Sequence, residues 1–257
     1  MSNKREREKR REERIQAESK AESGDRRTRM LQLGAGAVFI AIVAVVVVIV
    51  IASSGGDESG GNAEELAKVS EVNSSLSGVP QEGMVLGDPN APVELVEFGD
   101  LQCPVCKVAS EEVLPPLIEG QVEQGQAKLV FKNFTIISEE SIPAGQAAVA
   151  AGMQDVGWNF LEVFYRNQGE ERSGYVTDEF LTAVAEAAGV PDIEQWNEDR
   201  DSAKVKKEVE QTAREAQQLG FTGTPSYAID GPGTNGLEPI GNVGSAGELE
   251  SAIDAAS

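Results

Sequence analysis

The pattern of apolar and polar positions begins with one long apolar run near the N-terminus. Residues 31–52 contain no charged side chain and are dominated by Val, Ile and Ala. At about 1.5 Å per residue, a helix of this length reaches about 33 Å, enough to cross a hydrocarbon core about 30 Å thick. We therefore expect a single transmembrane helix at 31–52.

The charges on either side of this run predict its orientation. Residues 1–30 carry 11 Lys and Arg against 7 Asp and Glu, and Arg26, Arg27 and Arg29 lie next to the apolar run. Asp57 and Glu58 follow it, without a nearby cation. Because cations favour the cytoplasmic side, we expect a charged cytoplasmic tail at 1–30, a single pass through the cell membrane, and the rest of the chain outside the cytoplasm.

Two other export routes remain open for this segment. A cleavable signal peptide would end near Ala52, although the apolar run and the charged head are both longer than is usual in such peptides. The pair Arg26-Arg27 also allows a twin-arginine export signal, but the residues around it fit that signal poorly and an ordinary positive flank explains these two cations. The length of the run favours an uncleaved anchor.

A polar segment and then a folded domain follow the predicted anchor. Residues 53–62 read SSGGDESGGN, a composition that cannot bury apolar surface. We expect a flexible linker at 53–83, with room for a short helix at 63–72, and a folded domain at 84–257.

Within that domain the periodicity changes from strand to helix and back to strand. Strands are predicted at 92–98, 127–134, 225–229 and 238–240, and helices at 103–119, across most of 141–219, and at 246–255. We expect Pro115 and Pro116 to bend the first helix. The order predicts an α/β domain interrupted by a helical insertion at about 138–219.

Charge argues against one class of partner. The net charge is −21, and residues 31–257 alone carry 11 Lys and Arg against 36 Asp and Glu. Affinity for nucleic acid depends mainly on cations that neutralise phosphates. We therefore expect no nucleic-acid partner.

The chain has two cysteines, Cys103 and Cys106, in the sequence QCPVC, and no histidine. A structural zinc site usually needs four Cys or His ligands, so we expect no metal. The lack of histidine also excludes the usual Cys-His proteases and Ser-His-Asp hydrolases. A purely structural disulfide remains open, but a loop this short stabilises a fold only weakly.

Redox chemistry fits this spacing at the start of a helix. Unpaired backbone N–H groups and the helix dipole would stabilise a thiolate at Cys103, which we predict to be the nucleophile. Cys106 lies one helical turn further and would resolve a mixed disulfide. Pro104 is well suited to the first turn, where its missing N–H needs no partner.

A second motif, Gly223-Thr224-Pro225-Ser226-Tyr227, precedes a predicted strand near the C-terminus. Together with VELVEFGDLQCPVC, FKNF, an Ala-rich helix, WNFLEVFY and PIGNVG, it makes residues 80–253 resemble the membrane-anchored DsbA branch of the thioredoxin superfamily. The resemblance implies an α/β thioredoxin-like fold with an inserted helical subdomain, preceded here by the predicted transmembrane helix.

The resemblance also implies roles for residues outside the cysteine pair. Pro225 would be a cis-proline facing the cysteines, and Thr224 would bind an extended client together with Pro104 and Val105. Glu97 would assist proton transfer to the inner cysteine. Without the resemblance, the favoured interpretation of Pro225 is an ordinary trans turn proline, and that of Glu97 is a solvated carboxylate on a strand.

The resemblance predicts a dithiol oxidase without a cofactor other than its own Cys103–Cys106 disulfide. Its clients would be reduced exported proteins, and a DsbB-like membrane partner would reoxidise it. Val105 stands where the best-known members carry histidine, so the protein is expected to be a milder oxidant. A reductase or isomerase, and a non-catalytic binding domain, remain open.

Overall fold

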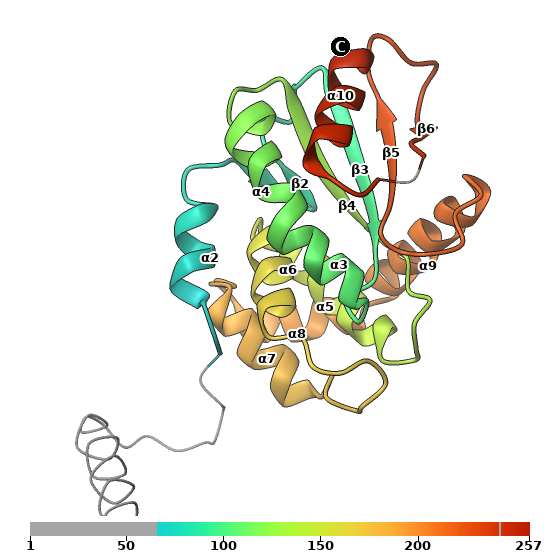
Figure 1. Cartoon of the computed structure of the whole chain (residues 1–257). Helices are drawn as coiled ribbons and strands as arrows, with labels where there is room; N and C mark the ends of the chain where they lie inside the picture. Colours follow the sequence, from blue (N-terminus) through green and yellow to red (C-terminus); the bar gives the residue numbers. More distant parts are fainter. Residues whose placement is uncertain (1–65, 242) are drawn as a thin grey trace, which may run out of the picture. The chain divides into compact units, whose positions relative to one another are not determined.

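A computed structural model describes residues 66–241 and 243–257. These residues form a six-stranded sheet with helices on both faces, and Figure 1 shows α3, α4 and α10 in front of it. In the part of the chain so described, no helix is long and apolar enough to span a membrane. The predicted tail at 1–30, the predicted anchor at 31–52 and residues 53–65 of the predicted linker lie outside the described residues.

The strands are β1 Gln81–Glu82, β2 Val85–Leu86, β3 Val93–Gly99, β4 Ala127–Asn133, β5 Ser226–Asp230 and β6 Glu238–Pro239. The α-helices are α2 Val69–Ser75, α3 Pro104–Val108, α4 Leu114–Leu117, α5 Ser141–Gly152, α6 Gly157–Arg166, α7 Asp178–Ala187, α8 Ile193–Asp201, α9 Ala203–Gln218 and α10 Ala246–Ala256. Two π-helical turns, η1 Ala109–Val113 and η2 Ile118–Val122, flank α4.

The central strand of the sheet is β3. The strand order is β1-β2-β4-β3-β5-β6, with β3 parallel to β4 and antiparallel to β5. Leu95 is opposite Leu129 of β4 and Ile229 of β5. The parallel pair needs a crossover connection, which the helical segment from α3 to η2 provides.

Because side chains alternate along a strand, β3 supplies both cores of the domain. Leu95 joins the larger core, which includes side chains of α4, α6 and α10, and we call this side of the sheet the α6 face. Val96 and Phe98 join a smaller core with Ala216 of α9, and we call this side the α9 face.

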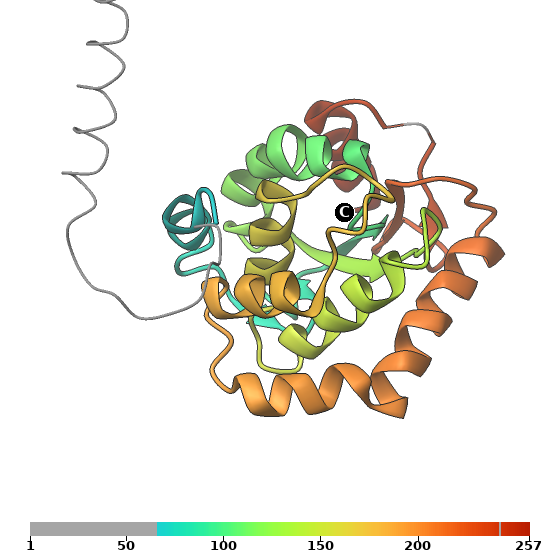
Figure 2. The same cartoon turned by 90° about the horizontal axis from the view of Figure 1, so that it is seen from below.

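The five helices α5–α9 lie between β4 and β5, which confirms the predicted helical insertion. The insertion has no separate core, because Trp158 and Phe160 are buried in the same cluster as the sheet residues of the α6 face. Both aromatic side chains are therefore core residues. Seen from below, α8 and α9 form the outer edge of this block (Figure 2).

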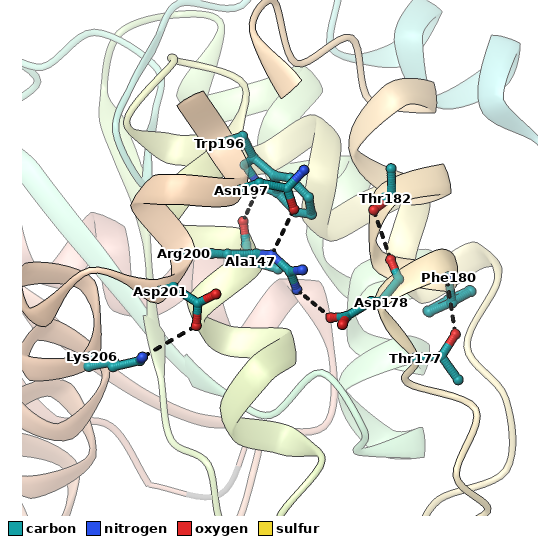
Figure 3. Close-up of polar contacts among 10 residues, drawn as sticks. All are labelled: Ala147, Thr177, Asp178, Phe180, Thr182, Trp196, Asn197, Arg200, Asp201 and Lys206. Atoms are coloured by element: carbon teal, nitrogen blue, oxygen red, sulfur yellow. Dashed lines mark hydrogen bonds and ion pairs between the residues drawn. The ribbon is translucent and has the colours of Figure 1, made fainter. Parts of the chain in front are cut away.

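Polar contacts join the inserted helices to one another (Figure 3). The indole Nε1 of Trp196 donates a hydrogen bond to the carbonyl oxygen of Ala147 at 2.9 Å, which links α8 to α5. Arg200 Nη1 lies 2.9 Å from Asp178 Oδ1 and links α8 to the first turn of α7. The first contact gives the buried indole N–H a partner, whereas the Asp178 carboxylate is largely exposed to solvent.

The predicted flexible linker at 53–83 is wrong for the part that the structure describes. Helix α2 buries Val72, and Leu76 one turn later is buried as well, so both belong to the core of the α6 face. The hairpin β1–β2 extends the sheet, with Val85 opposite Val130 of β4. The folded domain therefore begins before Met84, because two apolar residues four apart anchor an otherwise polar segment.

The helix that begins after Cys103 is irregular where a bend was expected. It runs from Pro104 through α3, η1 and α4 to Val122, and η1 comes immediately before Leu114-Pro115-Pro116. A proline inside a helix lacks an N–H and clashes with the carbonyl oxygen four residues earlier. A wider π-helical turn at this point relieves that clash.

Candidate functional site

The two cysteines lie just beyond the carboxyl end of β3, where α3 begins. Cys103 is the N-cap residue of α3, with extended backbone angles (φ −76°, ψ 119°), and Cys106 lies inside the first turn. Both are free thiols, exposed by 4% and 0% respectively. The predicted helix start is therefore confirmed, and the spacing places both sulfurs at one helix end.

The Cys103 sulfur has hydrogen-bonding groups on two sides. It accepts a hydrogen bond from the backbone N–H of Cys106 at 3.4 Å, and its thiol donates to the carbonyl oxygen of Thr224 at 3.3 Å. The Cys106 thiol at its side, helped by nearby backbone N–H groups and opposed by burial, lowers the pKa of Cys103 to about 6. Cys103 is therefore largely a thiolate at neutral pH.

The environment of Cys106 has the opposite effect. Complete burial raises the pKa of Cys106 well above its usual value, and the hydrogen bond to Cys103 and the charge of Glu97 raise it further. Cys106 therefore keeps its proton at neutral pH. One cysteine is prepared to attack or to leave, whereas the other needs a base before it can react.

Glu97 lies on β3 and faces the same side of the sheet as Cys106. It is 4% exposed, so the alternative of a solvated strand carboxylate is wrong. Its Oε1 has no hydrogen-bond partner among the described residues. Burial, then the charge of Glu162 and then that of Cys103, raise the pKa of Glu97 to about 8. The group can therefore hold or release a proton near physiological pH.

The Thr224-Pro225 pair lies at the start of β5, next to the cysteines. The peptide bond between these two residues is cis, as the resemblance implied, and the alternative of a trans turn proline is wrong. The hydrogen bond from Cys103 joins the two motifs although 121 residues separate them along the chain.

Pro104 and Val105, between the cysteines, are both exposed. The side chain of Val105 is 59% exposed, and Val108 on the next turn is exposed as well. The structure thus places an apolar surface directly beside Cys103. Isolated exposed apolar residues are common, so their exposure alone does not assign a partner to this surface.

Asp100 and Gln102 belong to the site, although no sequence pattern marks either residue. Buried Asp100 accepts hydrogen bonds from the backbone N–H groups of Gln102, Ile136 and Ile137, at 2.8 to 2.9 Å. The side chain of Gln102 donates to Glu140 Oε2 at 3.0 Å. These contacts fix the turn before Cys103 against the loop that follows β4.

A further contact joins the helical insertion to this turn. Gln168, just after α6, donates from Nε2 to the carbonyl oxygens of Leu101 at 2.7 Å and Cys103 at 3.1 Å. No sequence motif marks this glutamine. The backbone that presents the nucleophile is therefore held from both the sheet and the insertion.

No group of three or more His, Cys, Asp and Glu side chains that could hold a metal ion occurs in residues 66–241 and 243–257. The ionisable groups at this site are instead the thiols of Cys103 and Cys106 and isolated carboxyl groups near them, and each group has a different environment. Such an arrangement transfers protons and exchanges sulfur bonds.

Comparison with known proteins agrees with this chemistry. The family model described as thioredoxin matches residues 80–246, which is more than half of the chain. A probable disulfide bond formation protein D of Bacillus cereus is 34% identical over 149 residues, or 57% of this chain and 69% of the relative. Disulfide bond formation protein D of Bacillus subtilis is 28% identical over 167 residues, or 63% of this chain and 75% of the relative.

Among solved structures, oxidised BdbD of Bacillus subtilis is similar with a TM-score of 0.59 and 25% sequence identity. The similarity covers 68% of this chain and 95% of that chain. It therefore includes nearly the whole of that solved chain.

Proposed function

Because the chain belongs to the thioredoxin family, in its DsbA branch, and is a thiol-disulfide oxidoreductase, we propose that it is a dithiol oxidase acting through Cys103 and Cys106. The observation that carries the proposal is the difference between the two thiols. The pKa of Cys103 is lowered to about 6, whereas that of Cys106 is raised. A stabilised thiolate favours the reduced form, and a protein that favours its reduced form is an oxidant.

The first step breaks the Cys103–Cys106 disulfide. A client thiolate attacks the Cys103 sulfur, a mixed disulfide forms, and the Cys106 sulfur leaves with the bonding electron pair. Buried Cys106 is unfavourable as a thiolate, so it takes a proton. Glu97, whose pKa is raised to about 8, is protonated at neutral pH and supplies that proton.

The second step releases the oxidised client. A second client thiolate attacks the client sulfur of the mixed disulfide, a client disulfide forms, and Cys103 leaves as a thiolate. Two electrons have then passed from the client to the cysteine pair. The low pKa of Cys103 makes it the better leaving group, which favours this direction.

Client binding uses the exposed surface beside Cys103. Val105 and Pro104 offer apolar contacts, and Thr224 offers backbone groups at the edge of the cis-proline loop. An extended client segment that pairs with this loop would bring its cysteine to Cys103. Such backbone pairing accepts many sequences, as an enzyme with many clients requires.

The proposed place of action is outside the cytoplasm, with the segment 31–52 as a single-pass anchor in the cell membrane. Its clients would be reduced exported proteins, since disulfides persist outside the cytoplasm. A DsbB-like membrane protein would accept the two electrons and restore the Cys103–Cys106 disulfide. An anchor would keep the pair close to that partner.

The test is the reduction potential of the full-length protein, equilibrated in glutathione buffers and measured from the redox state of the two cysteines. We expect a value between about −120 and −180 mV, the range of disulfide donors and isomerases. A value near about −270 mV would contradict the oxidase and indicate a reductase instead. Val105 in place of a cationic side chain predicts the less oxidising end of the expected range.

A trapping experiment separates an enzyme from a non-catalytic domain of the same fold. In Cys106→Ala, no second thiol can resolve the mixed disulfide, so client proteins should accumulate on Cys103. Cys103→Ala is the matched control and should trap nothing. If Cys106→Ala also traps nothing in cells that export disulfide-containing proteins, the domain does not exchange disulfides.

A further inference from the structure

A second buried carboxyl group, Glu162, lies in the core of the α6 face and takes no part in the steps above. Its side chain belongs to α6, and the residue is only 5% exposed. Ser110 Oγ donates a hydrogen bond to Glu162 Oε1 at 2.8 Å, and Arg166 Nη2 lies 3.3 Å from Glu162 Oε2. Burying a carboxylate that has only two partners costs free energy. A functional role for Glu162 would explain why it lies in the core.

The contacts of Glu162 connect it to the helix that carries the inner cysteine. Ser110 lies four residues after Cys106 in the same continuous helical segment, within the π-helical turn η1. Residues four apart share a face of a helix. Glu162 therefore bonds to the residue one turn beyond Cys106, on the side that faces the sheet core.

A second set of contacts connects α6 to the strand that carries Glu97. Tyr165 lies three residues after Glu162, and its hydroxyl donates to the carbonyl oxygen of Asp100 at 3.4 Å. The same hydroxyl lies 3.3 Å from where a Cβ on Gly99 would be, and Gly99 shares its strand face with Glu97. This face of α6 therefore packs against the face of β3 that presents Glu97.

The charges in this region are coupled. Burial raises the pKa of Glu162 to about 7, against the lowering effects of Ser110 and Arg166. When Glu162 is ionised, its negative charge contributes to the raised pKa of Glu97. Two like charges in one apolar core disfavour the second ionisation.

We propose that Glu162 is a positioning residue of the redox centre, which acts through Glu97 to control how readily the proton of Cys106 is taken up and given back. This inference rests on the proposed function, because the proton of Cys106 is transferred only during disulfide exchange. Glu162 touches neither client nor sulfur. It sets the charge that Glu97 experiences when Cys106 attacks or leaves.

The other groups that face Glu162 come from each element packed against it. The turn η1 contributes Ser110 and Glu111, of which Glu111 lies 3.4 Å from Arg166 Nη1. Helix α6 itself contributes Arg166. Strand β3 contributes Glu97. Arg166 is thus shared between a buried and a half-exposed carboxylate, so it neutralises Glu162 only in part.

The experiment follows the reaction of the reduced full-length protein with Ellman's reagent at a series of pH values. The Cys103 thiolate first displaces one thionitrobenzoate and forms a mixed disulfide. Cys106 then gives its proton to ionised Glu97, attacks the Cys103 sulfur and displaces the second thionitrobenzoate, leaving the Cys103–Cys106 disulfide. The rate of the second release rises with pH as Glu97 ionises, so its midpoint follows the pKa of Glu97.

In Glu162→Gln the negative charge near Glu97 is lost, so the pKa of Glu97 falls. We expect the midpoint of the second release to move to lower pH by about one unit, with the first release unchanged. Glu162→Asp restores a carboxylate and should return the midpoint toward that of the wild type. The matched control is Glu215→Gln, which removes one charge from a lysine pair on the α9 face and should leave both midpoints unchanged.

The outcomes separate this inference from the proposed function. An unchanged midpoint in Glu162→Gln, with both releases present, would overturn the role of Glu162 and leave the oxidoreductase intact. Loss of the second release in the wild type would instead contradict the proposed redox pair.

If Glu162→Gln does not fold, Glu162→Met removes the same charge without burying an amide. Carboxyl resonances of the wild type, titrated by NMR, need no variant: independent titration of Glu97 and Glu162 would overturn the inference.

Discussion

The two faces of the sheet are built from the same strands but hold very different side chains. On the α9 face, Val96 and Phe98 pack against apolar residues of α9, and the ion pair between Lys132 and Glu215 lies at the edge, partly in solvent. On the α6 face, β3 presents Glu97 to a core that also contains the inner cysteine and Glu162.

The difference shows how a small domain separates stability from reactivity. Charged groups at the edge of the α9 face retain water, and the apolar interior behind them provides stability. Charged groups in the α6 face have lost water, so their pKa values move toward neutral pH, where proton transfer is useful. Substitutions on the two faces should therefore have different effects.

The largest effect is expected at the reactive sulfur. Cys103→Ser removes the only atom that can form a mixed disulfide, so the rate of client oxidation should fall at least about a thousandfold. The measurement is the oxidation of a dithiol peptide by the full-length protein. Thermal unfolding of the same variant should remain close to that of the reduced wild type; a large loss of stability would contradict the separation between the faces.

The opposite result is expected for Phe98 on the α9 face. This ring is fully buried, with its centroid 5.4 Å from that of Phe221. Phe98→Ala should lower the free energy of unfolding by about 3 to 5 kcal/mol, because it removes apolar contacts and leaves a cavity. Urea denaturation measures the loss. The folded fraction should still oxidise the peptide at nearly the wild-type rate, and a change in the Cys103 pKa would argue against independent faces.

A third test uses the dependence of stability on pH. The pKa of Glu97 is about 8 in the folded protein and about 4.5 in the unfolded chain, so the folded state binds the proton more tightly. The stabilisation is complete below the lower value and is lost as pH rises to about 8, in total about 5 kcal/mol. Glu97→Leu lacks this term, so its unfolding free energy should fall less steeply than that of the wild type. Parallel curves would show that Glu97 is not protonated in the core.

The smallest effect is expected for the ion pair at the edge of the α9 face. Lys132 Nζ lies 2.7 Å from Glu215 Oε1, but the Glu215 side chain is more than one third exposed. Glu215→Gln should change the free energy of unfolding by less than about 0.5 kcal/mol, and the reduction potential not measurably. A shift of the reduction potential would mean that charges on the α9 face affect the cysteine pair electrostatically through the sheet.

The sequence predicts the parts of the fold that depend on periodicity. The alternation in VELVEFG and AKLVFKN predicts the two central strands, and the apolar spacing within the insertion predicts most of its helices. The pair Cys103 and Cys106 can be placed because a spacing of three residues corresponds to one helical turn. Glu97 shares the parity of Val93 and Leu95, which is compatible with the core face of the strand, but only the resemblance implied its role at the site.

The remaining features depend on contacts between distant segments. The short helix expected at 63–72 overlaps α2, but the β1–β2 hairpin is short and lies in a sequence rich in turn residues, so only packing reveals it. Gln168 reaches Cys103 because the insertion returns to the sheet, and no local pattern encodes that return. Glu162 reads as an ordinary polar position on an amphipathic helix until both neighbouring elements cover it.

The order of the strands also determines when the redox centre is assembled during synthesis. Strand β3 ends at Gly99, but its antiparallel neighbour β5 begins only at Ser226. A chain that emerges N-terminus first therefore carries β3 with one open edge, next to an uncovered pair of thiols, until most of the chain has followed. Open strand edges attract other chains. Thr224 and β5 are synthesised late. When they are in place, β5 covers the open edge of β3 and Thr224 completes the surroundings of Cys103. The redox centre is therefore complete only when this strand edge is no longer open to misassembly.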